Sequence, residues 1–298
     1  MVRIKRFRYI LHGILYRKCG PKSNGRMRKT DTILLFRVHK IRMMLVSFCG
    51  LCYDEKKAPI VAGRRKEDAF MKRSEINRAL RELEALCEKF HCYLPPFCHF
   101  TPEEWKHKGH EYDEVRDCCL GWDITDYGMG NFDKMGFSLI TIRNGNRAMP
   151  EKYPKVYAEK LLSLKEGQYS PNHFHWFKTE DIINRGGGNV LIRVYNSHPD
   201  ESIDYESDVT VHTDGRTYTV PAGTQIRLTP GESIHVQQYL YHDFAVEEGT
   251  GPVLLGEVSQ CNDDNTDNRF SPPVGRFPTI EEDEPPYRLL CNEYPVAK

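Results

Sequence analysis

The chain has 298 residues, of which 39% are hydrophobic and 28% charged, enough for one large domain or two small ones. No run of 18 apolar residues occurs, which argues against a membrane-spanning helix. The zero net charge hides a split: residues 1–70 carry 18 Lys and Arg against 5 Asp and Glu (+13), and the rest carry 24 against 37 (−13).

The ten cysteines show no regular spacing and follow no secretory leader, which favours free thiols in a reducing, cytoplasmic compartment. Cys49 and Cys52 resemble half of a zinc or redox motif, but no second pair lies at zinc-ribbon spacing. We therefore assign no function to this pair.

Residues 1–70 scatter basic residues among apolar fragments without a helical or strand period. Such an arginine-rich, acid-poor segment is typical of an organelle transit peptide or of a nucleic-acid-binding tail. A third interpretation is that the natural protein starts at Met71, where an orderly pattern begins. The sequence favours this third interpretation, with residues 1–70 as an extension and residues 71–298 as the folded domain.

Two helices are predicted after Met71. Ser74 can cap the first, whose apolar stripe consists of Ile76, Leu80, Leu83, Cys87 and Phe90. Residues 94–96, Leu-Pro-Pro, end this helix. A second, short helix is predicted at residues 101–104, where a threonine cap, a proline and two acids coincide.

From about Gly136 onward the pattern predicts short strands, at residues 137–143, 157–164, 189–195, 209–213, 217–220, 225–228, 233–236 and 253–259. Asn144-Gly145 and Asp214-Gly215 are typical of hairpin turns. This spacing, with glycine-rich turns, is typical of a β-sandwich or a jelly-roll barrel. We expect the acidic, proline-rich tail from Asp263 to wrap the outside in irregular form.

Residues 167–187 contain the pattern G-x5-H-x-H-x4-E-x6-G. His173 and His175 lie two residues apart, so on a strand they face the same side and can converge on one ion. Glu180 has the opposite parity, so a bend must intervene before its carboxylate joins them, and Lys178 should lie close to Glu180. The glycines at 186–188 permit a sharp return into the next strand.

This pattern resembles the first motif of the cupin superfamily, whose members are double-stranded β-helices with a metal inside the barrel. The second cupin motif resembles G-x5-P-x-G-x2-H. Here Gly231 and His242 are in place, but Gln237 and Tyr239 stand where proline and glycine are usual. The resemblance implies a mainly β fold, a cupin jelly-roll barrel with N-terminal helices packed outside. The metal ligands that spacing and resemblance together indicate are His173, His175, Glu180 and His242.

Three other histidines are left out of this set. His235 has odd parity relative to His242, and His198 and His212 are interpreted as loop or surface residues. The chosen ligands suit manganese, iron, zinc, cobalt or nickel, and ligand type alone does not choose among them.

A narrower resemblance, to the D-lyxose isomerase family, covers about residues 71–294. It is carried by the runs L-G-W-D-I-T-D-Y-G (120–128), T-I-R-N-G (141–145), Y-A-E-K (157–160), H-F-H-W-F-K-T-E-D-I-I-N-R-G-G-G-N (173–189), R-L-T-P-G-E-S-I (227–234), G-E-V-S-Q-C-N-D-D (256–264) and L-L-C-N-E-Y (289–294). The resemblance implies a manganese-dependent, homodimeric cupin enzyme that interconverts D-lyxose with D-xylulose and D-mannose with D-fructose.

Such a reaction moves a proton between C1 and C2 through a cis-enediol, so it needs a base and stabilisation of negative charge. Glu257 is the predicted base, because a carboxylate in mid-strand is out of place unless it faces a polar interior. Lys178 is predicted to polarise or protonate a sugar oxygen. Surface or core positions remain alternatives for these two residues and for the candidate substrate-binding residues, which are Asp263, Asp264, Arg269 and Trp176.

Two other functions remain open. One is a different metal-dependent cupin enzyme, an oxygenase or an epimerase. The other is a non-catalytic sugar-sensing cupin in which residues 1–70 contact nucleic acid. The density of the family-like runs favours a cytoplasmic isomerase with a sugar substrate and neither a nucleic-acid nor a membrane partner.

Overall fold

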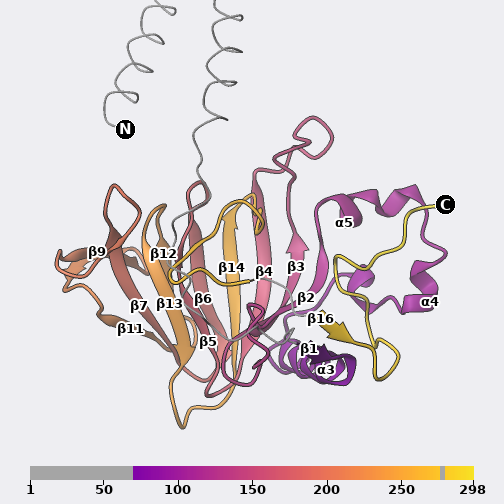
Figure 1. Ribbon diagram of the computed structural model, residues 1–298, viewed down its shortest axis with the longest axis horizontal. Helices are drawn as coiled ribbons and strands as arrows, with labels where there is room; N and C mark the ends of the chain where they lie inside the picture. The colour runs from indigo at the N-terminus through magenta and orange to yellow at the C-terminus, as the bar shows by residue number, and fades with distance from the viewer. Residues whose placement is uncertain (1–69, 276–278) are drawn as a thin grey trace, which may run out of the picture. The chain divides into compact units, whose positions relative to one another are not determined.

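The computed structural model describes residues 70–275 and 279–298 (Figure 1). The helical elements are α3 (Arg73–Lys89), η1 (Pro96–His99), α4 (Pro102–Trp105), η2 (His110–Tyr112) and α5 (Asp113–Asp117). The strands are β1 (Phe70–Lys72), β2 (Gly121–Thr125), β3 (Phe137–Arg143), β4 (Tyr157–Leu164), β5 (Tyr169–Phe174), β6 (Glu180–Gly187), β7 (Val190–Ser197), β8 (Ile203–Asp204), β9 (Val209–Thr213), β10 (Arg216–Val220), β11 (Gln225–Leu228), β12 (Ser233–Val236), β13 (Tyr241–Val246), β14 (Val253–Gln260), β15 (Arg269–Phe270) and β16 (Thr279–Glu281).

Two antiparallel sheets form the barrel. The larger has eight strands in the order β10-β9-β12-β6-β14-β4-β3-β2, and the smaller has the order β11-β7-β13-β5-β15, with β8 paired to β7. The sheets curl and face each other, with the helices gathered beside β2 and β3 (Figure 1). The mainly β cupin fold, a jelly-roll barrel with the helices outside, is therefore confirmed.

The larger sheet is buried on both faces around β14, β4 and β3. Leu162 and Leu255 face the smaller sheet, whereas their neighbours Leu161 and Leu254 pack on the helical side. A strand that is covered on both faces has no polar side, which explains the nearly continuous apolar runs in these strands.

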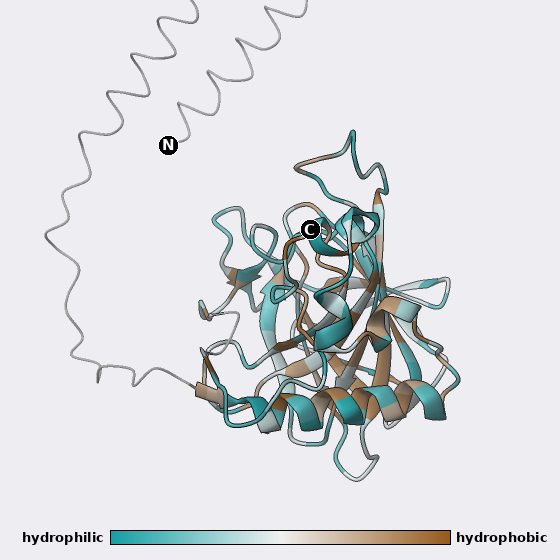
Figure 2. Cartoon of the chain, turned by 90° about the vertical axis from the view of Figure 1, so that its right-hand side faces the viewer, coloured by the Kyte–Doolittle hydropathy of each residue, from teal (hydrophilic) through white to brown (hydrophobic). Residues whose placement is uncertain are grey.

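Helix α3 covers the outer face of this sheet. Its apolar stripe is confirmed, since Ile76, Leu80, Leu83 and Cys87 are buried and the helix contacts β3, β4 and β14. Bands of hydrophobic colour recur along the helix in Figure 2. The predicted cap is wrong, because the helix begins at Arg73, and the Ser74 hydroxyl instead donates to Asp283 (2.7 Å). The second helix is confirmed, with Thr101 as its cap.

The C-terminal tail is more ordered than expected. Strand β15 extends the smaller sheet at its edge, and β16 pairs in parallel with β1. Arg73, buried at the start of α3, forms ion pairs with Glu282 (2.6 Å) and Glu293 (2.5 Å). The tail is therefore fastened to the first helix of the domain.

One of the two predicted hairpin turns is confirmed and the other is wrong. Asp214 and Gly215 join β9 to β10 with positive φ angles of 48° and 77°. Asn144, in contrast, opens a loop that runs from residue 144 to residue 156 before β4 begins. Its side chain bridges to the backbone of Cys118 and Asn262, so a tertiary contact replaces the tight turn.

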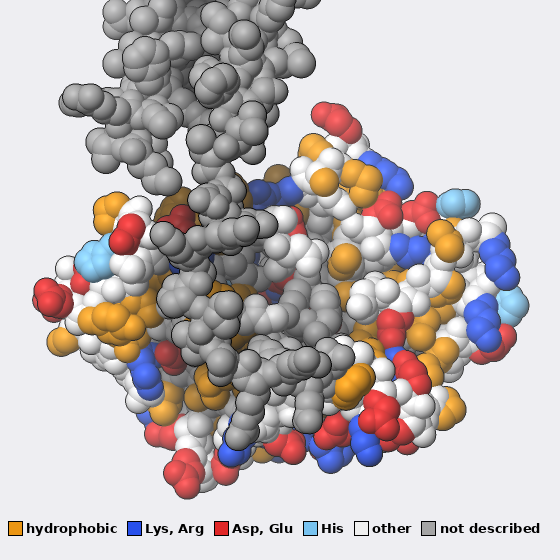
Figure 3. Space-filling view, viewed as in Figure 1, with side chains coloured by type: hydrophobic (Ala, Val, Ile, Leu, Met, Phe, Trp, Pro, Cys, Tyr) orange, Lys and Arg blue, Asp and Glu red, His pale blue; other side chains and the backbone are white. Residues whose placement is uncertain are grey.

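Residues 1–69 lie outside the described residues, and with them almost all of the predicted basic extension and the Cys49–Cys52 pair. The seven cysteines that the structure describes are free thiols. No helix in the described ranges is long and apolar enough to cross a membrane. On the face seen in Figure 3, acidic and basic side chains lie interspersed over the described surface.

Candidate active site

A cavity of about 290 Å³ lies between the two sheets. Part of its wall is apolar and comes from strands of both sheets, including Leu139, Ile182, Phe244 and Leu255. The rest is lined by hydroxyl, imidazole, carboxylate and ammonium groups. Such a mixture suits a small polar ligand, because a few placed polar groups orient it and the apolar wall excludes water.

The predicted bend between the histidines and Glu180 is confirmed. Strand β5 ends at Phe174 and β6 begins at Glu180, so the intervening residues carry the chain from one sheet to the other. His242 lies opposite His173 on the neighbouring strand β13. The Tyr239 backbone before it has a φ of 61°, a value that favours glycine, and its N–H donates to the His175 carbonyl (3.0 Å).

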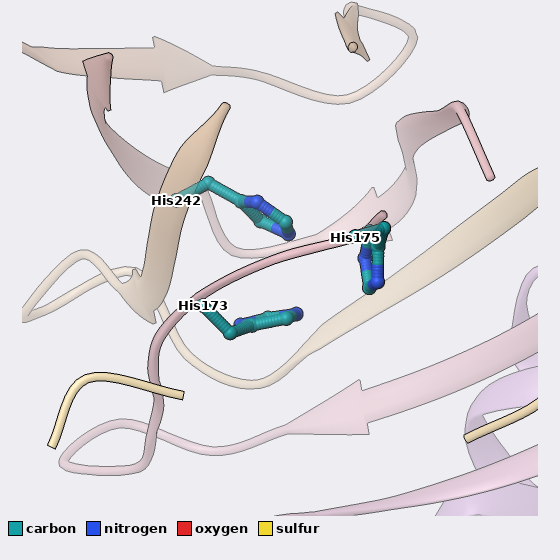
Figure 4. Close-up of side chains that lie close together, drawn as sticks. All are labelled: His173, His175 and His242. Atoms are coloured by element: carbon teal, nitrogen blue, oxygen red, sulfur yellow. The ribbon is translucent and has the colours of Figure 1, made fainter. Parts of the chain in front are cut away.

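Three buried imidazole rings converge, and two of them, His173 and His175, line the cavity (Figure 4). His173, His175 and His242 each offer a nitrogen, and these nitrogens lie within 4.8 Å of one another. The Nδ1 atoms lie close to backbone carbonyl oxygens, those of Pro171 (2.8 Å), Asp267 (2.9 Å) and Leu240 (3.1 Å) respectively.

This arrangement fixes the tautomer of each ring. A carbonyl oxygen can only accept, so Nδ1 carries the proton and Nε2 keeps its lone pair. The Nε2 atoms of His175 and His242 are buried and have no hydrogen-bond partner among the described residues. Lone pairs left this way are costly unless an ion or a ligand uses them, so the three histidines could hold a metal ion.

Burial keeps the His173 and His175 rings neutral. It lowers the pKa of His173 well below its usual value, and the neighbouring His242 and His175 rings lower it further. Burial also lowers the pKa of His175, and the Lys178 ammonium adds to the effect. Neutral imidazole is the form that binds a metal.

Glu180 lies beside two of the rings. Its carboxylate oxygens are 3.2 Å from Nε2 of His242 and 3.4 Å from Nε2 of His175. The Lys178 ammonium lies 2.7 Å from the same carboxylate, as the shared parity predicted. Burial alone would raise the pKa of Glu180, but the charge of the neighbouring Lys178 ammonium outweighs it and holds the pKa well below its usual value. Glu180 is therefore ionised and can supply an oxygen ligand.

Glu257 lies between two buried lysines on the cavity wall. The ammonium groups of Lys178 and Lys160 lie 3.0 Å and 3.3 Å from the same carboxylate oxygen, Oε1. Lys160 also reaches Asp264 (3.5 Å) and the side chain of Asn262 (2.8 Å). The structure thus brings together Glu257, Lys178 and Asp264, all expected from the sequence, and adds Lys160.

Three of the expected substrate-binding residues lie elsewhere. Arg269 (3.5 Å) and the Trp176 indole N–H (3.2 Å) both meet Glu201, and neither residue lines the cavity. Asp263 accepts from the Thr266 hydroxyl (2.5 Å) within its own turn. Their contact with the sugar stays a prediction.

Asp267 is a positioning residue that the sequence reasoning missed. Its buried carboxylate accepts the backbone N–H groups of Phe177 (2.8 Å) and Lys178 (3.0 Å), and its carbonyl holds His175. It therefore ties the loop after β14 to the segment that carries His175 and Lys178. It lies in a loop, so only its tertiary contacts reveal this role.

Comparison with known proteins identifies the family. The sequence pattern described as D-lyxose isomerase matches residues 71–294. The D-lyxose/D-mannose isomerase of Serratia proteamaculans is 47% identical over 225 residues, covering 75% of this chain and 98% of that protein. The chain belongs to the D-lyxose isomerase family. Members of this family are aldose–ketose isomerases.

One further curated relative and two solved structures are similar to this chain. The D-lyxose/D-mannose isomerase of Escherichia coli O157:H7 is 46% identical to this chain over 226 residues, covering 75% of this chain and 98% of that protein. Among solved structures, Cellulomonas parahominis L-ribose isomerase with L-ribose matches at a TM-score of 0.47 and 15% identity, covering 72% of this chain and 100% of that chain. Geodermatophilus obscurus L-ribose isomerase matches at 0.47 and 16%, with coverages of 72% and 99%.

Proposed function

We propose that this chain is a divalent-metal-dependent isomerase that interconverts D-lyxose with D-xylulose and D-mannose with D-fructose. The observation that carries the proposal is a buried carboxylate, Glu257, held between two lysines in the cavity where three imidazole nitrogens converge. The names of the relatives support the choice of sugars.

The proposed metal ligands are His173, His175, His242 and Glu180. The neutral rings with their Nε2 lone pairs and the ionised carboxylate match the needs of manganese, the metal that the family resemblance implies. When bound there, a divalent cation would act as a Lewis acid toward the sugar oxygens and stabilise the negative charge of the enediol.

Glu257 is the proposed base. In the open-chain aldose it accepts the proton from C2 and returns it to C1, while the hydroxyl proton of O2 passes to O1. Its carboxylate lines the cavity and is oriented by two ammonium groups that cannot compete for a carbon-bound proton. The proton moves and no oxidant is consumed, so the reaction balances within one sugar molecule.

Lys178 is proposed as the cationic donor to a sugar oxygen. Burial would lower its pKa, but the carboxylates of Glu180, Glu257 and Asp264 outweigh burial and raise the pKa. The side chain therefore stays an ammonium group, which can polarise or protonate an oxygen but cannot act as a base. Lys160 holds Glu257 and Asp264 from the other side, and we assign it a positioning role.

The substrate proposal is tested by incubating the purified full chain with manganese and, in separate anaerobic reactions, D-lyxose, D-mannose and other aldoses. Proton NMR in D2O would follow ketose formation and the uptake of deuterium at carbon. We expect D-xylulose and D-fructose to form without oxygen. Epimers without ketose, or turnover that requires oxygen, would instead support the alternative cupin enzymes.

We further propose that the enzyme acts as a cytoplasmic homodimer, as the family resemblance implies. Light scattering coupled to size-exclusion chromatography would give the mass of the particle in solution. A mass of one chain under turnover conditions would contradict the dimer.

A further inference from the structure

Two buried hydroxyl groups meet on the cavity wall and have no part in the proposed chemistry. The Tyr127 and Ser170 hydroxyl oxygens lie 2.7 Å apart, and both residues are buried and line the cavity. Buried hydroxyl groups cost free energy unless their hydrogen-bonding capacity is used. A pair of buried hydroxyl groups at the wall of a cavity therefore indicates that a ligand binds to them.

Counting protons shows what the pair can offer. One hydroxyl donates to the other, so one of the two protons is used. Neither hydroxyl has another hydrogen-bond partner among the described residues. Whichever hydroxyl donates, one proton remains for a partner in the cavity. Burial raises the pKa of Tyr127, so its phenol remains protonated.

A β-bulge turns Ser170 toward the cavity. His242 pairs with His173 and Phe244 pairs with Ser170, so a step of two residues on β13 matches a step of three on β5. Residues three apart on a regular strand face opposite sides, but the bulge lets Ser170 and His173 face the same side. Bulges that redirect a side chain in this way are common beside active sites.

The position of Tyr127 is set by its backbone conformation and by its neighbours. Its φ of 57° lies in the left-handed region, and its N–H donates to the Thr125 hydroxyl (3.0 Å). Phe270 packs against the Tyr127 ring in a T-shaped arrangement, 5.4 Å between centroids, and stacks on His173 at 5.0 Å. Contacts with neighbouring side chains therefore fix the Tyr127 ring in the cavity wall.

We infer that the Tyr127–Ser170 pair binds a hydroxyl group of the open-chain sugar away from the C1–C2 bond. The inference rests on the proposed function. Glu257 is on β14 in the larger sheet, whereas Ser170 is on β5 in the smaller sheet, so the pair contacts a part of the substrate that the base does not. A polyol needs such contacts, because every hydroxyl that enters the cavity loses its hydrogen bonds to water.

The test uses Tyr127→Phe, Ser170→Ala and the double variant in the manganese-loaded full chain. We expect the KM for D-lyxose to rise about 3- to 10-fold in each single variant, the usual effect of losing one uncharged hydrogen bond, with kcat within about two-fold. Because the two hydroxyls act as one unit, the loss of binding free energy in the double variant should be smaller than the sum of the losses in the two single variants. Calorimetry with D-arabinitol, the polyol that matches D-lyxose but lacks the carbonyl, should show the same weakening without any turnover.

Tyr294→Phe is the matched control. It also removes a tyrosine hydroxyl with a protein partner, the Leu120 carbonyl (2.9 Å), but lies outside the cavity. Its KM should stay at the wild-type value, and metal content and melting temperature show that each variant is folded. Unchanged KM in both single variants, or a fall in kcat alone, would refute the subsite. Failure of the wild-type protein to isomerise any sugar would refute the proposed function instead.

Discussion

Each of the three histidine rings is hydrogen-bonded through Nδ1, which leaves Nε2 available to bind a metal ion. The Nδ1 protons of His173, His175 and His242 point to backbone carbonyl oxygens, which belong to Pro171 in β5, to Asp267 in the loop after β14 and to Leu240 just before β13. Ring orientation and tautomer are therefore set by the protein before any ion binds. Preorganisation of this kind lowers the cost of assembling a metal site.

His242→Ala is expected to lose both bound metal and activity, because it removes one ligand from the converging set. Metal per chain, measured by mass spectrometry after gel filtration, and isomerase rate should fall together. His235→Ala is the control, since that histidine lies half exposed on β12 and pairs with Asp181 (2.7 Å). A His242→Ala protein with a full complement of metal and normal turnover would remove the residue from the ligand set.

Glu257→Gln separates the chemical step from binding. Glutamine keeps the shape and the hydrogen-bonding capacity but cannot accept a carbon-bound proton. Turnover should fall at least ~100-fold, the usual scale for loss of a general base, while metal content is unchanged. Glu159→Gln, whose carboxylate instead pairs with Arg143 (3.1 Å), should retain wild-type rates. A loss of only a few-fold in the Glu257 variant would assign the base elsewhere, with Asp264, which also lines the cavity, as the next candidate.

At the scale of elements, the apolar strands could be predicted, whereas the two strands that carry His173 and His242 could not. The strands around the buried sheet centre, β3, β4 and β14, lie where the apolar pattern placed them, within one residue at each end. Strands β5 and β13 were missed because the inward positions Ser170, His173 and His242 are polar. A polar cavity interrupts the alternation on which strand prediction depends.

Lys160, which lies opposite Glu257, could have been predicted from the sequence. Glu257 was selected because a charge in mid-strand needs a polar interior, and the same reasoning applies to Lys160 within β4. Cross-strand pairing places the two directly opposite each other. The roles of Asp267 and Asn144 could not be predicted, because their partners lie far away in the sequence.

Arg73→Met tests how α3 and the C-terminal tail hold together. Losing the buried guanidinium leaves Glu282 and Glu293 without their partner, and we expect a loss of about 2 kcal/mol in unfolding free energy because both carboxylates keep some solvent contact. Denaturant unfolding would measure it. Arg78→Met on the same helix, an exposed residue whose ion pair with Asp133 is 3.8 Å long, should change stability by less than about 0.5 kcal/mol.

The same contact gives a pH dependence. The hydrogen bond from Arg73 holds the pKa of Glu282 below its usual value. A lowered folded-state pKa stabilises the protein above the ordinary glutamate pKa, and this stabilisation is lost as the pH falls through the lowered value. The Arg73→Met protein should therefore lose less stability than the wild type between pH 5 and pH 3, and parallel losses would contradict the ion pair.

At the scale of the whole molecule, we propose that residues 71–298 form the complete catalytic domain. The family match begins at residue 71, and strand β1 and Arg73 fasten this end of the domain to the tail. A chain that starts at Met71 should bind metal and isomerise sugar like the full chain, with a similar or higher melting temperature.

A chain that starts at Ser74 is the matched comparison, because it also removes β1 and Arg73. Its melting temperature should be several degrees lower than that of the chain from Met71. Insolubility or a large loss of activity in the chain from Met71 would show that residues 1–70 contribute to the domain.

We propose that sugar isomerisation requires one metal ion per chain, held by the three histidines and Glu180. The most direct measurement is a titration of the metal-depleted full chain with manganese, with D-lyxose turnover recorded at each step. Activity should be absent at the start, rise in proportion to added metal and level off at one equivalent per chain, and His242→Ala should stay inactive throughout. Full activity in the metal-depleted protein, or a rise that continues well beyond one equivalent, would contradict the account.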